Sequence, residues 1–319
     1  MEQPGDERIH VTFDHLRRLE GRARNLSFLP RQPSRSVLNG RHASRMRGRG
    51  LDFEEIRTYL PGDDIRSIDW KVTARRGTPH VRVFNEERDR PALILVDQRM
   101  TMFFGSVHTM KSVTAAEAAA LAAFRIRDVG DRVGGIVFAD SRSKSFRPER
   151  SRRALNAFLN ATAAMNRSLA ADRAGGDDTA SLNEPLAQAA RMAGHDHLVI
   201  VISDFVGFDR ETDRILSALA RHNDLVLAIV HDPMARELPR GSRIVVGDGR
   251  LQVQLDLGDR TVVRAMQDVV RERFDAVLAL QARAGAAVLP LHTGAGTVDQ
   301  MNHLFGRTAR AGIRGRARS

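Results

Sequence analysis

Residues 57 to 75 hold the densest group of side chains that could do chemistry. Three aspartates alternate there with three arginines: Asp63, Asp64 and Asp69 with Arg57, Arg66 and Arg75. Neighbouring carboxylates can serve as general acid and base in a hydrolase. They can also cap turns and pair with the arginines, because structural ion-pair networks have the same composition as acid–base sites. We favour the structural interpretation, since no positioned nucleophile or base accompanies the aspartates.

The same segment contains the chain's single tyrosine, Tyr59, and its single tryptophan, Trp70. Pro61 and Gly62 fit the second and third positions of a type II turn, where glycine supplies the positive φ. Trp70 could anchor a partner protein, because tryptophan is enriched among the residues that dominate interfaces. A lone tryptophan is, however, more often a core residue. The segment is therefore predicted to be a charge-paired structural element or a partner-docking surface.

Other signals for chemistry are weaker. His195 and His197 precede a predicted strand, but a metal site needs further ligands at a suitable spacing. The chain has no cysteine, which excludes disulfides and thiolate nucleophiles. Its sequence contains no Walker A loop, serine nucleophile elbow or Rossmann glycine fingerprint. These features favour a protein that is not an enzyme and has no cofactor.

Hydrophobic patterns predict the elements that must position these residues. Short apolar runs rich in β-branched residues predict strands buried on both faces, at residues 92–96, 133–138, 198–202, 225–230 and 286–291. Helical patterns lie between them, at residues 109–127, 155–165, 181–192, 212–219 and 262–278. Ser181 and Glu184 match a capping box at the start of one of these helices. The alternation predicts an α/β fold with a mostly parallel sheet and helices on both faces.

Composition divides the chain into four parts. Residues 1–46 are predicted to be a basic segment with a short helix, and residues 47–90 a β-rich motif region. Residues 91–305 form the predicted α/β domain, with a β-hairpin insertion near residues 243–256. Residues 306–319 are predicted to be a basic disordered tail.

The formal net charge is +11, and the excess is concentrated in residues 31–50 and 306–319, which contain many arginines and no acidic residue. Such segments can bind nucleic acid or an acidic protein surface, or can simply be solvated ends. The beginning of the sequence has no signal-peptide pattern, and no apolar run is long enough to span a membrane. We therefore expect a cytoplasmic protein with no membrane span.

Three ordered motifs together resemble a known bacterial family. They read Gly48-Arg-Gly50-Leu-Asp52-Phe53-Glu54-Glu55-Ile-Arg57, then Tyr59-Leu-Pro61-Gly62-Asp63-Asp64-Ile-Arg66-Ser-Ile-Asp69-Trp70-Lys71-Val-Thr73-Ala74-Arg75, then Phe84-Asn-Glu86-Glu87-Arg88. The pattern closely resembles the domain-of-unknown-function family fifty-eight, over roughly residues 40 to 300. This resemblance implies a von Willebrand factor A-like, Rossmann-like α/β domain after the motif region.

Members of that family are typically encoded beside MoxR-type AAA ATPases and other von Willebrand A-like proteins. The resemblance therefore implies a non-enzymatic adaptor that has these proteins as partners, in protein maturation, metal insertion or stress responses. Two alternatives stay open. One is a nucleic-acid-binding protein that uses the basic ends, and the other, which we favour least, is a metal-dependent hydrolase that uses the aspartates.

The resemblance also implies a place for Mg²⁺, because von Willebrand A domains often hold this ion with an Asp-x-Ser-x-Ser loop after the first strand. Here the loop is Asp97-Gln98-Arg99-Met100-Thr101, so an arginine replaces the first serine. Arginine has no acceptor lone pair and is always charged. Asp204 lies after a strand at the place of the family's third-loop aspartate, and Thr179 aligns loosely with its second-loop threonine.

Three interpretations of this loop stay open. In the one that we favour, Arg99 pairs with Asp97 and Asp204 in a degenerate site and stands in for the metal charge. In the second, Arg99 swings outward and leaves a working Mg²⁺ site, because oxygen ligands suit this hard cation. In the third, Arg99 points elsewhere, and the remaining residues with Thr101 form a polar loop cluster.

Overall fold

The computed structural model describes residues 6–24, 26, 51–61, 63–86, 90–170, 181–235, 243–247, 252–256 and 259–304. The chain divides into an α/β unit, Met1–Pro30 with Arg90–Ser319, and a small unit, Arg31–Asp89. The basic segments at 31–50 and 306–319, with the predicted tail, lie outside the described residues. The division differs from the predicted boundary at residue 46, because the first helices pack into the α/β core.

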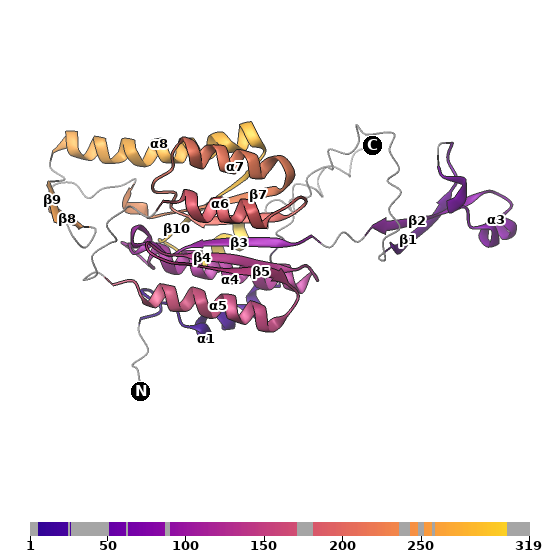
Figure 1. Cartoon of the computed structure of the whole chain (residues 1–319), viewed down its shortest axis with the longest axis horizontal. Helices are drawn as coiled ribbons and strands as arrows, with labels where there is room; N and C mark the ends of the chain where they lie inside the picture. The colour runs from indigo at the N-terminus through magenta and orange to yellow at the C-terminus, as the bar shows by residue number, and fades with distance from the viewer. Residues whose placement is uncertain are drawn as a thin grey trace. The chain divides into compact units, whose positions relative to one another are not determined.

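A six-stranded sheet forms the centre of the α/β unit, in the order β10-β7-β6-β3-β4-β5 (Figure 1). Its strands are β3 (Ala92–Asp97), β4 (Val133–Phe138), β5 (Ser143–Glu149), β6 (Leu198–Ser203), β7 (Asp224–His231) and β10 (Ala287–His292). All neighbouring strands are parallel except β4 and β5. The predicted α/β fold with a mostly parallel sheet is therefore confirmed, with β5 as an added antiparallel edge strand.

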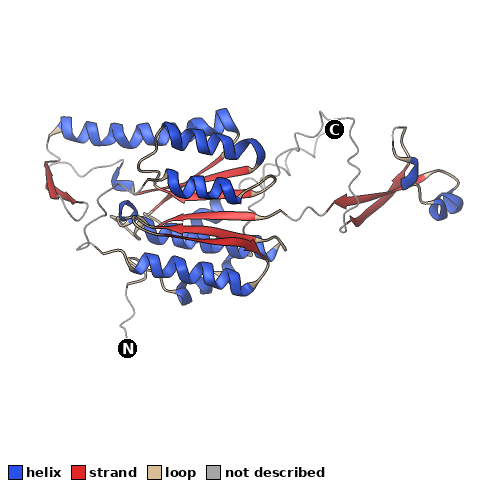
Figure 2. Ribbon diagram, viewed as in Figure 1, coloured by secondary structure: helices blue, strands red, loops and turns tan. Residues whose placement is uncertain are grey.

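Helices cover both faces of this sheet (Figures 1 and 2). One face carries α1 (Phe13–Arg18), α2 (Glu20–Ala23), α4 (Lys111–Asp128) and α5 (Arg152–Arg167), and the other carries α6 (Asn183–Met192), α7 (Arg210–His222) and α8 (Arg260–Ala284). Successive side chains of a strand point to opposite faces. In β3, Ile94 accordingly packs with the first group of helices and Leu95 with the second.

The first residues belong to the α/β unit because their apolar side chains enter its core. Leu16 and Leu26 are buried in the same cluster as α4 and α5. The backbone N–H of Val11 donates to the buried side-chain oxygen of Asn166 on α5 at 2.7 Å. Asn166 donates in turn to Gln98 at 2.9 Å. The N-terminal segment is thus bonded to the loop that follows β3.

His15 on α1 links this segment to α4 through charge. Its imidazole nitrogens lie 2.7 Å from a carboxylate oxygen of Glu117 and 2.9 Å from one of Glu7. Glu117 also accepts a hydrogen bond from Thr297 at 2.5 Å. The hydrogen bond with Glu117 raises the pKa of His15, with a smaller contribution from Glu7, and together they outweigh the opposing effect of burial.

We expect this ion pair to make folding stability depend on pH. The stabilisation is complete below the unfolded pKa of histidine, about 6.5, and is lost as the pH rises through the raised folded value, at about 1.4 kcal/mol for each unit of elevation. The stability advantage of the wild type over His15→Gln should therefore shrink between mildly acidic and alkaline pH. Urea unfolding measures this advantage, and His303→Gln, at an exposed histidine, is the control. An advantage that stays constant with pH would contradict the assignment.

The small unit, where the sequence predicts a β-rich region, contains two antiparallel strands, β1 (Leu51–Thr58) and β2 (His80–Glu86). Between them lie the 3-10 turn η2 (Ile65–Ser67) and the helix α3 (Trp70–Arg76), which the sequence patterns did not indicate. Gly77 ends α3 in the left-handed conformation, with φ 72°, which glycine adopts without a steric penalty.

Two further segments bear on the predictions. The strands β8 (Arg243–Gly247) and β9 (Gln252–Asp256) pair antiparallel within the region predicted as a hairpin insertion, and the 3-10 turn η4 (Pro233–Ala235) follows β7. The prediction of a capping box formed by Ser181 and Glu184 is wrong, because Leu182 occupies the N-cap of α6 and no side chain caps the helix. Ser181 accepts instead from the backbone N–H of Asn183 at 3.1 Å.

Candidate functional site

The carboxyl ends of β3 and β6 bring the predicted loop residues together. The chain passes from β3 to β4 on one side and later returns to β6 on the other. Such switch points are where ligands bind in open α/β sheets. We define the strand-end site by the residues that meet here: Asp97, Arg99, Thr101, Lys111, Ser203 and Asp204.

Arg99 and Asp97 form a buried ion pair in the strand-end site, with side chains that are 3% and 0% exposed. Nη2 and Nε of Arg99 donate to the Asp97 carboxylate at 2.8 and 3.1 Å, and the backbone N–H of Arg99 donates at 2.9 Å. Burial alone would lower the pKa of Arg99, but the Asp97 carboxylate outweighs it and the pKa is raised. Ser203 donates to the same carboxylate at 2.6 Å.

Asp204 is held by a different cation. Nζ of Lys111, the first residue of α4, donates to its carboxylate at 2.7 Å, and Nη2 of Arg99 lies 3.8 Å away. The backbone N–H of Val206 donates at 3.0 Å, whereas the Thr101 hydroxyl lies at the longer distance of 3.5 Å. Burial raises the pKa of Asp204, but Lys111 and Arg99 outweigh burial, so the pKa is lowered. Both carboxylates of the site thus have an internal counter-ion.

These contacts do not fit a Mg²⁺ ion. Mg²⁺ requires an octahedron of oxygen ligands at about 2.0–2.1 Å, but the carboxylates of Asp97 and Asp204 already accept hydrogen bonds from cations. Thr179 lies outside the described residues. Among the residues that the structure describes, no group of three or more His, Asp or Glu side chains could hold a metal. Arg99 therefore lies as expected for a degenerate site, and the absence of Mg²⁺ binding stays a prediction.

Lys111 and Ser203 are the members of the site that sequence reasoning missed. A signal for Lys111 exists, because a cation at the first residue of a helix faces the positive end of the helix dipole. Such a placement is unfavourable unless an anion compensates it, and Asp204 does so here. Ser203 follows the apolar run of β6 directly, and only the neighbouring strand shows that its hydroxyl reaches Asp97.

Another buried carboxylate, Asp232, follows β7. It accepts hydrogen bonds from the backbone and hydroxyl groups of Ser106, the hydroxyl of Thr293 and the backbone N–H of Met234. Burial raises the pKa of Asp232, but these donors outweigh burial and lower it. Asp232 therefore joins the loop after η3 (Met100–Met102) to the end of β10, and its oxygens are fully used.

The histidines considered as metal ligands lie apart from the strand-end site. His195 and His197 precede β6, at the amino end of that strand. The ring of His195 contacts that of His222 edge to face at 4.6 Å, and the backbone N–H of His197 donates to Asn223 at 2.9 Å. These contacts match the interpretation as ordinary strand-end histidines.

The motif aspartates of the small unit form turns and caps. Asp63 accepts two hydrogen bonds from the Arg57 guanidinium, both at 2.8 Å, and one from the backbone N–H of Leu60. Asp64 caps η2, and Asp69 caps α3 by accepting from two backbone N–H groups at 2.9 and 3.1 Å. This geometry supports the structural interpretation of the three aspartates.

The rest of the motif is only partly as expected. The backbone N–H of Tyr59 donates to the carbonyl of Pro79 at 2.9 Å, and that of Asp63 to Leu60 at 3.0 Å across the turn containing Pro61. Gly62 lies outside the described residues. The expected ion pairs of Arg66 and Arg75 are wrong, because neither side chain reaches a carboxylate of the described residues.

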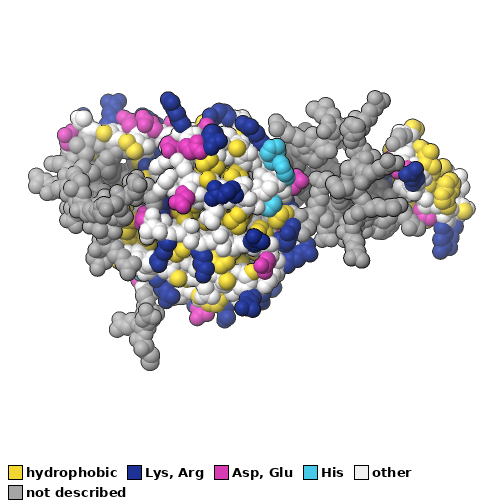
Figure 3. Space-filling view, in the orientation of Figure 1, with side chains coloured by type: hydrophobic (Ala, Val, Ile, Leu, Met, Phe, Trp, Pro, Cys, Tyr) yellow, Lys and Arg dark blue, Asp and Glu magenta, His cyan; other side chains and the backbone are white. Residues whose placement is uncertain are grey.

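The small unit exposes apolar side chains that a core would normally bury. We define the motif surface by Leu60, Ile65 and Trp70, which are 59%, 64% and 67% exposed. Hydrophobic side chains lie beside Lys and Arg side chains on the visible face of this unit (Figure 3). Trp70 is therefore not a core residue, contrary to the commoner role of a lone tryptophan.

Comparisons with known proteins agree with the motifs. The family model described as "Protein of unknown function DUF58" matches residues 55–284. Uncharacterized proteins of Mycobacterium tuberculosis and Mycobacterium bovis are each 31% identical over 274 residues, which cover 85% of this chain and 78% of the relative. No helix among the described residues is long and apolar enough to cross a membrane.

Two solved structures are also similar. The conserved hypothetical protein BatB from Bacteroides thetaiotaomicron is 14% identical, with a TM-score of 0.40, over 69% of this chain and 99% of BatB. The SpRpn10 VWA domain is 11% identical, with a TM-score of 0.37, over 67% of this chain and 94% of the domain. The family assignment rests on the match to the family model and on the mycobacterial relatives. This chain belongs to the DUF58 family, whose function is not known.

Proposed function

We propose that the protein is a cytoplasmic, non-enzymatic adaptor that works with a MoxR-type AAA ATPase and other von Willebrand A-like proteins, in protein maturation, metal insertion or stress responses. One observation carries the non-enzymatic part. Each carboxylate of the strand-end site is already paired with an internal cation, Asp97 with Arg99 and Asp204 with Lys111. A general acid or base must be free to exchange a proton with a substrate, whereas a binding surface needs no such group.

The motif surface supports docking to a protein. Large exposed apolar side chains that lie together commonly mark interaction sites, and tryptophan is enriched among the residues that dominate binding energy. Arg66, Lys71 and Arg75 are exposed residues of the same segment, and none forms an ion pair with a described residue. We therefore propose that the motif surface meets an apolar patch with an acidic rim on the ATPase.

Co-purification of the full chain with a MoxR-type ATPase of the same organism tests the adaptor role. We expect association at micromolar concentrations, and Trp70→Ala should weaken it by more than about tenfold, as the loss of a central anchor does. Val129→Ala is the matched control, because Val129 is an exposed apolar residue of the α/β unit. No association, with or without nucleotide, would argue against the adaptor role, and an unaltered affinity of Trp70→Ala would argue against the motif surface.

The net charge of +11 favours nucleic-acid binding as the second candidate function. Binding through the basic segments would be largely electrostatic, so its affinity should fall steeply as salt is added. Removal of residues 306–319 should reduce it further. Binding of an adaptor to a protein through the motif surface depends less on the basic segments. Removal of residues 306–319 should therefore weaken nucleic-acid binding and leave binding of the ATPase largely unchanged.

A further inference from the structure

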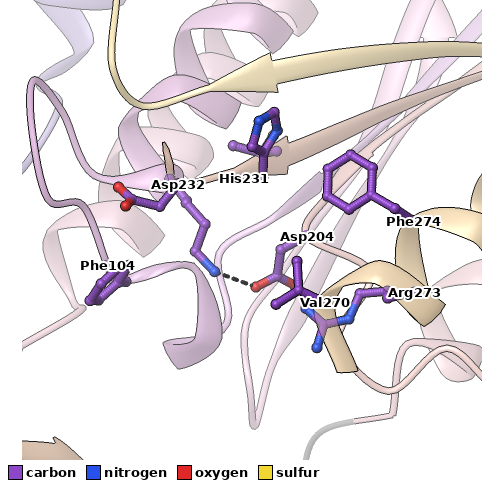
Figure 4. A pocket seen from close by; sticks show the side chains of 9 residues that line it. Phe104, Asp204, His231, Asp232, Val270, Arg273 and Phe274 are labelled. Atoms are coloured by element: carbon purple, nitrogen blue, oxygen red, sulfur yellow. Dashed lines mark hydrogen bonds and ion pairs between the residues drawn. The ribbon is translucent and has the colours of Figure 1, made fainter. Parts of the chain in front are cut away.

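A small pocket lies beside the strand-end site, with a volume of about 120 Å³. Its walls include the apolar side chains of Phe104, Val270 and Phe274, and its polar groups include Lys111, Asp204 and Arg273 (Figure 4). The volume is well below the roughly 300–1,000 Å³ of pockets for drug-sized ligands. It suits one short side chain with an apolar stem and a polar end.

Most of the charged groups in this pocket are already paired. Lys111 donates to Asp204 at 2.7 Å. Asp232, at the other end of the pocket, accepts from Ser106, Thr293 and Met234 and has no free oxygen. The pocket therefore offers little to an incoming cation, because both of its carboxylates already have donors.

Arg273 is the exception. It extends from α8 toward Asp204 (Figure 4), but no hydrogen bond or ion pair joins it to any residue that the structure describes. Its burial lowers its pKa; Asp204 acts in the opposite direction, and Arg99 adds to the lowering by repulsion. A half-buried guanidinium that is always charged is stabilised by a carboxylate placed against its two parallel N–H donors.

We propose that Arg273 and the apolar walls of this pocket bind the carboxylate of a glutamate or aspartate side chain presented by a partner protein. Phe104, Val270 and Phe274 would pack against the methylene groups of that side chain, and the carboxylate would meet the guanidinium of Arg273 in the bidentate geometry that this pair favours. This inference rests on the proposed function, because it names the chemistry that the adaptor recognises at the strand ends.

The charge of the pocket distinguishes a carboxylate from a phosphate. Arg273 supplies one positive charge that no described residue pairs with, and one carboxylate neutralises it. A phosphate group carries about −1.5 to −2 charges at neutral pH and would place its excess charge near Asp204 and Asp232. The pocket therefore favours a carboxylate over a phosphate.

Side-chain NMR of the full chain tests this inference with defined probes: glutamate blocked at both ends, glutarate and inorganic phosphate. We expect blocked glutamate to shift the Nε–H signal of Arg273 saturably at millimolar concentrations and to bind more tightly than phosphate. Arg273→Gln should weaken binding at least tenfold. Arg264→Gln, at an exposed arginine of the same helix, should leave it unchanged. Arg273→Lys keeps the charge but loses the planar fork, so it should recover only part of the affinity.

The outcomes separate this inference from the adaptor role. The carboxylate-binding role of the pocket would be refuted if the wild type and Arg273→Gln bound blocked glutamate equally, or if neither bound it. This holds even if the ATPase associates with the protein. Tighter binding of phosphate would overturn the carboxylate preference, and tighter binding of glutarate would point to a free dicarboxylate instead of a protein side chain. If the ATPase fails to associate while Arg273 binds blocked glutamate, the pocket stands and the partner is a different acidic protein.

Discussion

Replacing Arg99 with methionine should lower the free energy of unfolding by about 3–5 kcal/mol, because it leaves a buried carboxylate without its counter-ion. Asp97 is fully buried, and Arg99 supplies three of the hydrogen bonds to its oxygens from the side chain. Methionine fills a similar volume, so the change tests charge more than packing. Urea unfolding at neutral pH measures the difference.

A second variant separates the effect of the unpaired charge from the effect of altered packing. Asp97→Asn combined with Arg99→Met removes both charges, and exchange of a buried ion pair for uncharged side chains is often close to neutral. The double variant should therefore recover much of the loss. Arg214→Met is the matched control, because Arg214 pairs with Glu211 on the surface, where such pairs contribute about 0–1 kcal/mol. A loss of similar size at Arg214 and Arg99 would contradict the role of burial.

The strands that carry the site were predictable because they are buried on both faces. A run such as Leu198–Ile202 has no polar residue, and its β-branched side chains favour a strand over a helix. The edge strand β5 lacks this signal: its side chains are mostly exposed, and it contains Pro148, which sheets tolerate mainly at edges. Only the pairing with β4 defines it as a strand.

The site was predictable only in part, for a related reason. Asp97, Arg99 and Asp204 follow apolar runs directly, so parallel strands bring them to one end of the sheet. Lys111 begins α4, 93 residues before its partner Asp204, and Arg273 lies within α8. Nothing in the local sequence indicates that either side chain faces Asp204. Trp70 shows the same limit, because its 67% exposure depends on how α3 packs on β2 and not on its own residue type.

Lys111, the second cation of the strand-end site, bears on whether this loop could hold Mg²⁺. Arg99 alone suggested that one substitution separates this loop from a metal site. In the structure, however, Arg99 and Lys111 each neutralise one carboxylate. Two unit charges about 4 Å apart interact with roughly 1 kcal/mol in water, and a dication doubles this. Two cations therefore oppose Mg²⁺ by roughly 4 kcal/mol, which corresponds to about a thousandfold in affinity.

We accordingly expect the wild type to show no Mg²⁺ binding at millimolar concentrations in a calorimetric titration, whereas Arg99→Ser combined with Lys111→Ser should bind it saturably. The double variant keeps the oxygens of Asp97, Ser203 and Asp204 and adds a hydroxyl at position 99, which suits a hard cation. Each single variant retains one cation and should bind more weakly than the double variant. Millimolar binding by the wild type that Asp97→Ala abolishes would refute the degenerate site.

Folding provides an independent measure of the same binding. The double variant loses the buried pairs of Asp97 and Asp204, so its stability without metal should fall. A ligand that binds only the folded state restores stability by about 2.7 kcal/mol at a hundred times its dissociation constant. Mg²⁺ should therefore raise the urea midpoint of the double variant and leave that of the wild type unchanged. If Mg²⁺ raises the urea midpoints of the wild type and the double variant equally, it acts elsewhere on the protein. The two proteins differ only at positions 99 and 111, which both lie in the strand-end site.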